Sequence, residues 1–111
     1  MELPEANWKE RLLYFLGRRR GALVEGNSML PVLKDGDAVL INPKAKVKTG
    51  DIVFANHPFK KSVKILKRVK NFTEKGDLYL VGDNPQESTD SRTFGAVPLK
   101  YLIGKATCRL K

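Results

Sequence analysis

Cysteine and histidine are almost absent from the sequence, which contains a single residue of each, Cys108 and His57. One cysteine excludes an intramolecular disulfide and gives no sign of an oxidising compartment. One histidine and one cysteine at unrelated positions cannot build a metal site, and we expect Cys108 to be a small buried residue rather than a nucleophile. The sequence therefore predicts neither a metal nor any other cofactor.

Long apolar runs are missing as well. No segment approaches the roughly 18 consecutive apolar residues of a membrane span. The longest apolar run near the N-terminus, residues 12–16, is followed by three arginines at residues 18–20. A secretory signal has its positive charge before the apolar core, so this order does not fit one. We expect no transmembrane segment.

Positive charge, by contrast, is abundant. Lys and Arg number 21 against 12 Asp and Glu, which gives a formal net charge of +9 at pH 7. This balance suits a nucleic acid, a membrane surface or an acidic substrate, and it equally suits a soluble surface rich in lysine. Because 41% of the 111 residues are apolar and 30% are charged, we expect one soluble globular domain.

Residues 5–16 predict a short amphipathic helix near the N-terminus. Trp8, Leu12, Phe15 and Leu16 share one broad helical face. We favour packing of this face on the domain, because so short a helix has little apolar area for membrane binding. Peripheral contact with a membrane or with a substrate, aided by the three arginines, is the alternative.

From residue 20 onwards the pattern changes to short apolar or alternating runs that are typical of strands. These runs cover residues 37–41, 51–55, 62–69, 78–81 and 102–110. Gly-Asp dipeptides at Gly36, Gly50, Gly76 and Gly82 separate several of them and predict turns with positive φ. The sequence therefore predicts a mainly β fold with one short N-terminal helix.

A turn at residues 24–31 presents a serine, Ser28, directly after an apolar run. Gly26 permits positive φ and a close backbone approach, and Pro31 prevents a long helix across the turn. A serine exposed on such a turn suits a nucleophile, because nearby backbone N–H groups can face a developing oxyanion. Gly-Asn-Ser is also ordinary turn chemistry, so the turn alone leaves both interpretations open.

Lys67 is the lysine best placed to act as a base for that serine. A serine hydroxyl needs a base, and lysine can serve when burial keeps its amine neutral. In a strand over residues 62–69, Lys67 shares a face with Ile65 and Val69, and the opposite face is charged and expected to be solvated. A strand-edge position with the amine in water is the alternative. His57 precedes a proline in an expected loop, which disfavours a Ser-His-Asp triad.

Several motifs, in this order, resemble those of the serine–lysine signal peptidases. They are Gly-Asn-Ser-Met-Leu-Pro at 26–31, Asp-Gly-Asp at 35–37, Gly-Asp-Ile-Val at 50–53, Leu-Lys-Arg-Val at 66–69, Gly-Asp-Asn-Pro at 82–85, Ser-Thr-Asp-Ser-Arg at 88–92 and Phe-Gly at 94–95. The resemblance implies a signal-peptidase-like catalytic core of short twisted antiparallel sheets, with Ser28 as nucleophile and Lys67 as general base. We assign residues 1–20 to the helix and basic segment and residues 21–111 to this core.

The resemblance also implies supporting roles around the dyad. The Ser28 backbone N–H is expected to supply the oxyanion site, and Gly26 lets the chain approach the substrate. The other implied positions are Asn27 with the oxyanion site, Ser88 as the hydroxyl that orients the lysine amine, Asp90 and Arg92 as an ionic brace, and Met29 as a pocket wall or plain core filling. A plain polar turn is the alternative for Ser88 and Asp90.

One branch of the family is especially similar, the nickel-type superoxide dismutase maturation proteases. The similarity lies in the short length, the absence of the usual membrane anchor, the opening Met-Glu-Leu-Pro-Glu and the motif at residues 82–95. It implies a cytoplasmic endopeptidase that removes an N-terminal leader from a precursor of the nickel-type dismutase.

Two other classes of protein remain as alternatives. A self-cleaving repressor-type peptidase shares the dyad, but its usual Ala-Gly or Cys-Gly cleavage site is missing here, and there is no room for a DNA-binding helix-turn-helix before residue 20. A basic β domain that binds nucleic acid would interleave aromatic and basic residues. Only residues 59–61 and 70–72 hint at this, so we expect no nucleic-acid partner.

Overall fold

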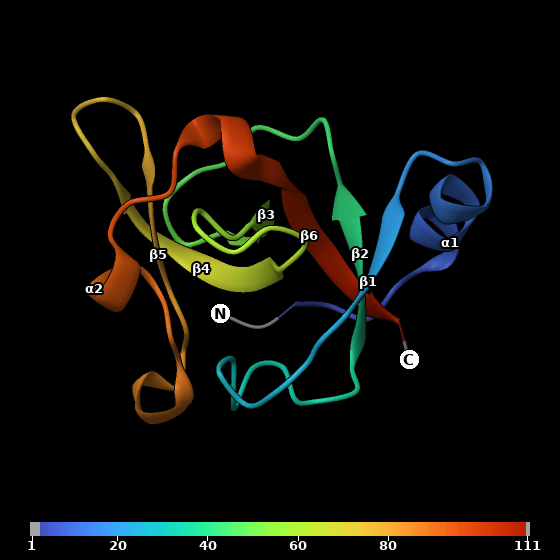
Figure 1. Cartoon of the computed structure of the whole chain (residues 1–111). Coiled ribbons are helices and arrows are strands. Elements are labelled where there is room, and N and C mark those ends of the chain that lie inside the picture. The colour runs from blue at the N-terminus through green and yellow to red at the C-terminus, as the bar shows by residue number, and fades with distance from the viewer. Residues whose placement is uncertain (1–2, 111) are drawn as a thin grey trace.

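The computed structural model describes residues 3–110 and contains one six-stranded antiparallel sheet (Figure 1). The elements are α1 (Trp8–Phe15), β1 (Arg20–Leu23), β2 (Ala38–Asn42), β3 (Ile52–Asn56), β4 (Lys64–Phe72), β5 (Leu78–Val81), the 3-10 helix η1 (Pro85–Glu87), α2 (Ser91–Phe94), the 3-10 helix η2 (Leu99–Tyr101) and β6 (Leu102–Leu110). This arrangement confirms the predicted mainly β fold with a short N-terminal helix. Met1 and Glu2 of the opening motif and Lys111 of the predicted core lie outside the described residues.

The strands follow the order β1-β2-β6-β3-β4-β5 across the sheet, and neighbouring strands pair antiparallel. Alternation along β3 divides the apolar core into two clusters. Ile52 belongs to the first cluster, and Val53 and Ala55 belong to the second cluster. The turn that carries Ser28 packs into the first cluster through Met29. The segment that carries Ser88 follows β5, whose side chains belong to the second cluster. The candidate site therefore lies where the two clusters meet.

β4 presents Lys67 on the same face as Ile65 and Val69, as the alternation predicted, and this face borders the second cluster. The opposite face was expected to be charged and solvated; Lys64 and Lys70 are exposed as expected, but the middle of this face is not. Leu66 packs against the first cluster, and Arg68 is half-buried. The reason is that β4 lies inside the sheet, with an apolar cluster on each side, so neither of its faces is fully open to water.

α1 begins three residues later than predicted, because Asn7 caps it. The Asn7 side chain accepts a hydrogen bond from the Glu10 N–H at 2.9 Å, which satisfies one of the free donors of the first turn. The residues before this cap run beside the end of β6, where the Ala6 N–H donates to the Arg109 carbonyl at 2.7 Å. The N-terminal segment is thus extended before it becomes helical.

The apolar face of α1 was predicted to pack on the domain, and this prediction was wrong. Trp8 is 76% exposed and Phe15 is 85% exposed, and no residue of α1 is buried. The periodicity located the apolar face correctly, but the helix is turned so that this face points away from the sheet. Within residues 3–110, no helix is long and apolar enough to cross a membrane.

Candidate active site

The serine turn is held by a segment that lies almost 60 residues further along the chain. The Asn84 N–H donates to the Ser28 carbonyl at 2.8 Å. The Asn84 side-chain amide donates to the Asn27 carbonyl at 3.0 Å, and the Asn27 side chain in turn donates to a Glu87 carboxylate oxygen at 3.3 Å. These contacts fix the backbone on both sides of the serine without using its hydroxyl.

Gly82 allows this close approach. A Cβ atom at this buried position would lie 2.6 Å from the Ser28 carbonyl oxygen and would also clash with the hydroxyl of Ser88. Gly82 was predicted to supply positive φ, and that prediction was wrong, because its φ lies outside the positive region that Gly36, Gly50 and Gly76 occupy. A glycine is required here by lack of space rather than by backbone conformation.

Lys67 is buried within the site, with only 6% of the residue exposed. Its Nζ donates a hydrogen bond to the Ser88 Oγ at 3.1 Å. Burial lowers the pKa of Lys67; the negative charge of Asp90 opposes this shift and the positive charge of Arg92 adds to it. The neutral amine is therefore populated at a lower pH than for an exposed lysine.

Ser88 links this amine to a fully ionised carboxylate. The Ser88 hydroxyl donates to Asp90, which is 1% exposed and also accepts the Gly82 N–H at 2.8 Å and the Arg92 guanidinium at 2.6 Å. Burial alone would raise the pKa of Asp90, but the hydrogen bonds from Arg92, Ser88 and the backbone outweigh it and lower this pKa far below the usual range. Because the Ser88 proton is committed to Asp90, its oxygen can only accept from Lys67, and this fixes the direction of the amine.

Ser28 and Lys67 line the same cleft, which has a volume of about 110 Å³. The remaining lining residues are Leu23, Val24, Glu25, Met29, Ile65 and Leu66. Among residues 3–110, no hydrogen bond joins the Ser28 hydroxyl to the lysine amine, and the Ser28 N–H donates to no other group. An unengaged N–H beside a serine hydroxyl is the arrangement that an oxyanion site requires.

The neighbours predicted to help that oxyanion site are placed around it, but several of their polar groups are used elsewhere. Gly26 has the predicted positive φ of 82°, and its N–H donates to the Asp35 carboxylate at 2.7 Å. The Asn27 side chain contacts Glu87, as described above. Met29 is buried in the first cluster and also lines the cleft, so both of its predicted roles apply.

An ion pair that the sequence did not predict ties β4 to the segment after β5. Arg68 meets Asp83 with two hydrogen bonds of 2.8 Å, and its guanidinium also donates to the Gly50 carbonyl at 2.8 Å. Asp83 belongs to the same motif as Gly82 and Asn84, so its presence in that motif was the only indication of such a role. The pair braces the strand one residue after the candidate base.

His57 and Cys108 have contacts that suit structural residues. The His57 Nδ1 accepts the backbone N–H groups of Phe59 and Lys60, both at 3.0 Å, which closes the loop after β3. Burial and the nearby Lys60 lower the pKa of His57. Cys108 is buried in β6, and burial raises the pKa of its thiol. In the part of the chain that the structure describes, no cluster of three or more histidine, cysteine or acidic residues could hold a metal ion.

Comparison with known proteins agrees with the family to which these motifs point. A sequence profile described as Peptidase S24-like matches residues 17–100. Mitochondrial inner membrane protease subunit 1 of Xenopus tropicalis is 31% identical over 79% of this chain and 66% of its own length. Mitochondrial ATP-independent inner membrane protease subunit 1a of Arabidopsis thaliana is 31% identical over 78% of this chain and 67% of its own length.

Mitochondrial inner membrane protease subunit 2 of Mus musculus is 36% identical over 78% of this chain and 63% of its own length. The chain spans about two thirds of the length of these curated relatives. The matched profile and the protease names of the relatives support a serine peptidase. The chain belongs to the Peptidase S24-like family.

Proposed function

We propose that this protein is a serine endopeptidase in which Ser28 attacks the peptide carbonyl and Lys67 accepts the serine proton. The observation that carries this proposal is the buried amine of Lys67, held by Ser88 in a cleft that it shares with Ser28. A lysine exposed to water would be charged near neutral pH and could not act as a base. Burial lowers the pKa of Lys67, which makes its neutral form more accessible than that of an exposed lysine.

The contacts of the site support a specific order of proton transfers. The neutral Lys67 amine takes the Ser28 proton as the serine oxygen bonds to the carbonyl carbon, and the Ser28 N–H receives the resulting oxyanion. The ammonium that forms is stabilised by the Ser88 oxygen and, through it, by the negative charge of Asp90. Lys67 then returns the proton to the leaving amine, and it activates water to release the acyl group in the second half of the reaction.

The cleft favours an extended peptide as substrate. Residues 23–25 line the cleft from the end of β1, and residues 65–67 line it from β4. β1 lies at the edge of the sheet, so an extended chain can pair with its outer backbone groups on the way to Ser28. We propose that this peptide is the N-terminal leader of a precursor, and that the precursor is a nickel-type superoxide dismutase in the cytoplasm.

The substrate proposal rests on the similarity of residues 82–95 to the maturation proteases, and the relatives carry names of a different kind, inner membrane protease subunits. The test is incubation of the protein with a nickel-type dismutase precursor, followed by mass spectrometry of the new N-terminus. We expect removal of the leader by the parent and none by Ser28→Ala. Thr89→Ala, which removes an exposed hydroxyl close to Ser88 in sequence, is the matched control and should process normally.

Two results would redirect the proposal. If the parent cleaved only its own chain, the self-cleaving peptidase would replace leader removal. If folded Ser28→Ala retained processing, the serine mechanism would be wrong whatever the substrate. Gel-shift titrations with DNA or RNA over a salt series would detect the remaining alternative, a basic β domain, because counterion release makes such binding strongly dependent on salt.

A further inference from the structure

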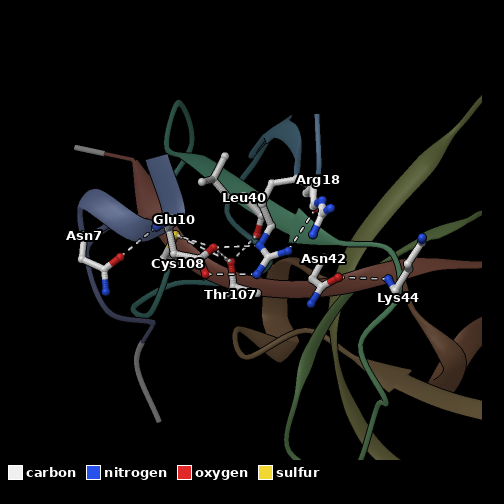
Figure 2. A network of polar contacts seen from close by, with 9 residues as sticks. Asn7, Glu10, Arg18, Leu40, Asn42, Lys44, Thr107 and Cys108 are labelled. Carbon is white, nitrogen blue, oxygen red and sulfur yellow. Dashed lines mark hydrogen bonds and ion pairs between the residues drawn. The ribbon is translucent and has the colours of Figure 1, made fainter. Parts of the chain in front are cut away.

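α1 presents an apolar stripe to the outside and turns its acidic residue toward the domain. Glu10, the one acidic residue of the helix, faces the domain, where it accepts hydrogen bonds from Arg19 at 2.9 Å and from Thr107 at 2.8 Å. Figure 2 shows Glu10 reaching from the helix toward Thr107 and Cys108 on β6. A surface helix normally turns its apolar stripe to the core and its charges to water. In this protein, the side of α1 that faces the domain is held by the hydrogen bonds of the Glu10 carboxylate.

The outer face of α1 consists of Trp8, Leu12, Phe15 and Leu16. At about 100° per residue these four side chains fall within an arc of roughly 100°. They are 76%, 46%, 85% and 60% exposed in that order. Among residues 3–110, no segment covers this face, so the apolar stripe is presented to the surroundings of the protein.

The exposure does not come from a loosely attached helix. Asn7 caps the first turn, and the Glu10 carboxylate is bound by two nitrogens of the Arg19 side chain. The ring of Tyr14 lies over Gly21 in β1, where an added Cβ would stand 3.4 Å from the tyrosine oxygen. The helix is therefore fastened along its inner side, and the outer face is held outward.

Cations surround the outer face. Lys9 and Arg11 flank it on the helix, and Arg18 and Arg20 follow in the chain. Lys44 lies across an open hollow of about 700 Å³ that Leu16 and Arg18 also line. In the described part of the chain none of these five cations makes an ion pair, since the nearest acid on the helix, Glu10, is committed to Arg19.

We propose that α1 rests on the surface of an anionic lipid bilayer, with the outer face at the boundary between headgroups and acyl chains. The surrounding cations then meet the headgroup phosphates, which is the usual arrangement of an interfacial helix. Charge complementarity favours the bilayer over a second copy of the chain, because a dimer joined through this face would bring the same unpaired cations together. The proposal is independent of the peptidase function.

Trp8 makes the proposal testable without a label, because it is the single tryptophan of the chain. The full chain is mixed with vesicles of phosphatidylcholine containing phosphatidylglycerol, and with vesicles of phosphatidylcholine alone. With the anionic vesicles we expect co-sedimentation, a blue shift of the Trp8 emission and protection from acrylamide. Binding to the neutral vesicles, or to anionic vesicles at high salt, should be about tenfold weaker or more.

Two pairs of variants distinguish vesicle binding through this face from non-specific adsorption of the protein. Phe15→Ser should weaken vesicle binding about tenfold, and Phe59→Ser, which alters a 74% exposed aromatic in the loop after β3, should not. Lys44→Ser should weaken binding to anionic vesicles, and Lys75→Ser, at another exposed lysine, should not. Circular dichroism checks that each variant is folded.

Three results would overturn the proposal. The first is an unshifted Trp8 emission with anionic vesicles. The second is equal binding of the parent, Phe15→Ser and Phe59→Ser. The third is a Trp8 shift that needs no vesicles and grows with protein concentration, together with a dimer in sedimentation experiments, which would assign the outer face to a second copy instead.

Discussion

The polar network beside α1 and the one in the candidate active site connect acid and base in different ways. Beside α1, Arg19 meets the Glu10 carboxylate directly, at 2.9 Å. In the candidate active site a hydroxyl separates the two charges, because Lys67 contacts Ser88 and Ser88 contacts Asp90. The direct hydrogen bonds from Arg19 are the main reason why the pKa of Glu10 is lowered, whereas burial is the main reason why that of Lys67 is lowered.

This difference indicates how a fold can hold one ionic network for structure and another for chemistry. A carboxylate in direct contact with a buried lysine would favour the ammonium and suppress the base. With Ser88 between them, Asp90 is close enough to stabilise the ammonium when it forms, yet burial still lowers the pKa of the resting amine.

The largest effect is expected from Lys67→Met, which keeps the bulk of the side chain and removes the base. Loss of a general base typically costs roughly 10²–10⁴-fold in rate. We expect peptide cleavage to fall by that amount, as measured by mass spectrometry with time, while the variant remains folded. Lys64→Met, at an exposed lysine on the same strand, is the control and should retain activity. The opposite outcome, an active Lys67→Met and an inactive Lys64→Met, would mean that the base is assigned to the wrong lysine.

Ser88→Ala removes the hydroxyl between the two charges. Leaving a buried partner without its hydrogen bond costs about 1–3 kcal/mol, which corresponds to a rate roughly tenfold to a hundredfold lower. The ammonium also loses an acceptor, so the pH at which activity rises should move down. The measurement is the pH profile of cleavage, with Thr89→Ala beside it. Parent rates at every pH would place Ser88 in an ordinary turn.

Glu10→Gln breaks the structural network and should leave the chemistry intact. We expect the free energy of unfolding to fall by about 1–3 kcal/mol, because Arg19 loses its charged partner. Cleavage of a soluble peptide should be unchanged. Chemical denaturation of the variant, with Glu74→Gln as the exposed control, measures the first effect. A slower enzyme with unaltered stability would show that this network belongs to the site after all.

The difference in stability between the parent and Glu10→Gln should also depend on pH, and the direction of this dependence follows from the pKa of Glu10. Because folding lowers the pKa of Glu10, its contribution to stability is present above the ordinary pKa and is lost as the pH falls through the lowered one. The difference between the parent and Glu10→Gln should therefore shrink in acid. A difference that stayed constant down to low pH would mean that the carboxylate charge does not stabilise the fold.

The smallest expected effect is a change in how the stability of the fold depends on pH, rather than a loss of activity. The pKa of Lys67 is lowered on folding, so between that value and the ordinary pKa of about 10.4 the unfolded chain binds more protons than the folded chain. Stability should rise with pH across this window. Lys67→Met should lack that rise, which denaturation at a series of pH values can detect. Parallel curves for parent and variant would show that the amine is not desolvated.

Local pattern indicated two candidates for the site, and the ordered motifs were needed to choose them over ordinary turn and strand-edge residues. The turn before Pro31 singled out Ser28, and alternation along one strand singled out Lys67 from its neighbours, since both signals lie within a few residues. Gly82 and Asn84 were not recognised as neighbours of the serine turn. Their role depends on the approach of segments almost 60 residues apart, which no local pattern reports.

The direction of α1 could not be predicted for a different reason. Helical periodicity identifies which side chains share a face, but it does not say which face meets the domain. The inward position of Glu10 depends on Arg19 and Thr107, and Thr107 is far away in the sequence. Apolar content suggested a buried face, but Glu10 faces the domain because its polar partners, Arg19 and Thr107, lie there.

Arg68 follows Lys67 directly in the chain, and the chemistry proposed for the site depends on keeping the two apart. The alternation of side chains along β4 places the Arg68 guanidinium on the side where Asp83 and the Gly50 carbonyl bind it, so the sheet separates the Lys67 amine from the Arg68 charge. A slip of one residue would exchange the two side chains and put an ion that never loses its proton opposite the serine. The contacts of Arg68 therefore help to hold β4 in its register. No change of pH could restore an enzyme in which that register had shifted.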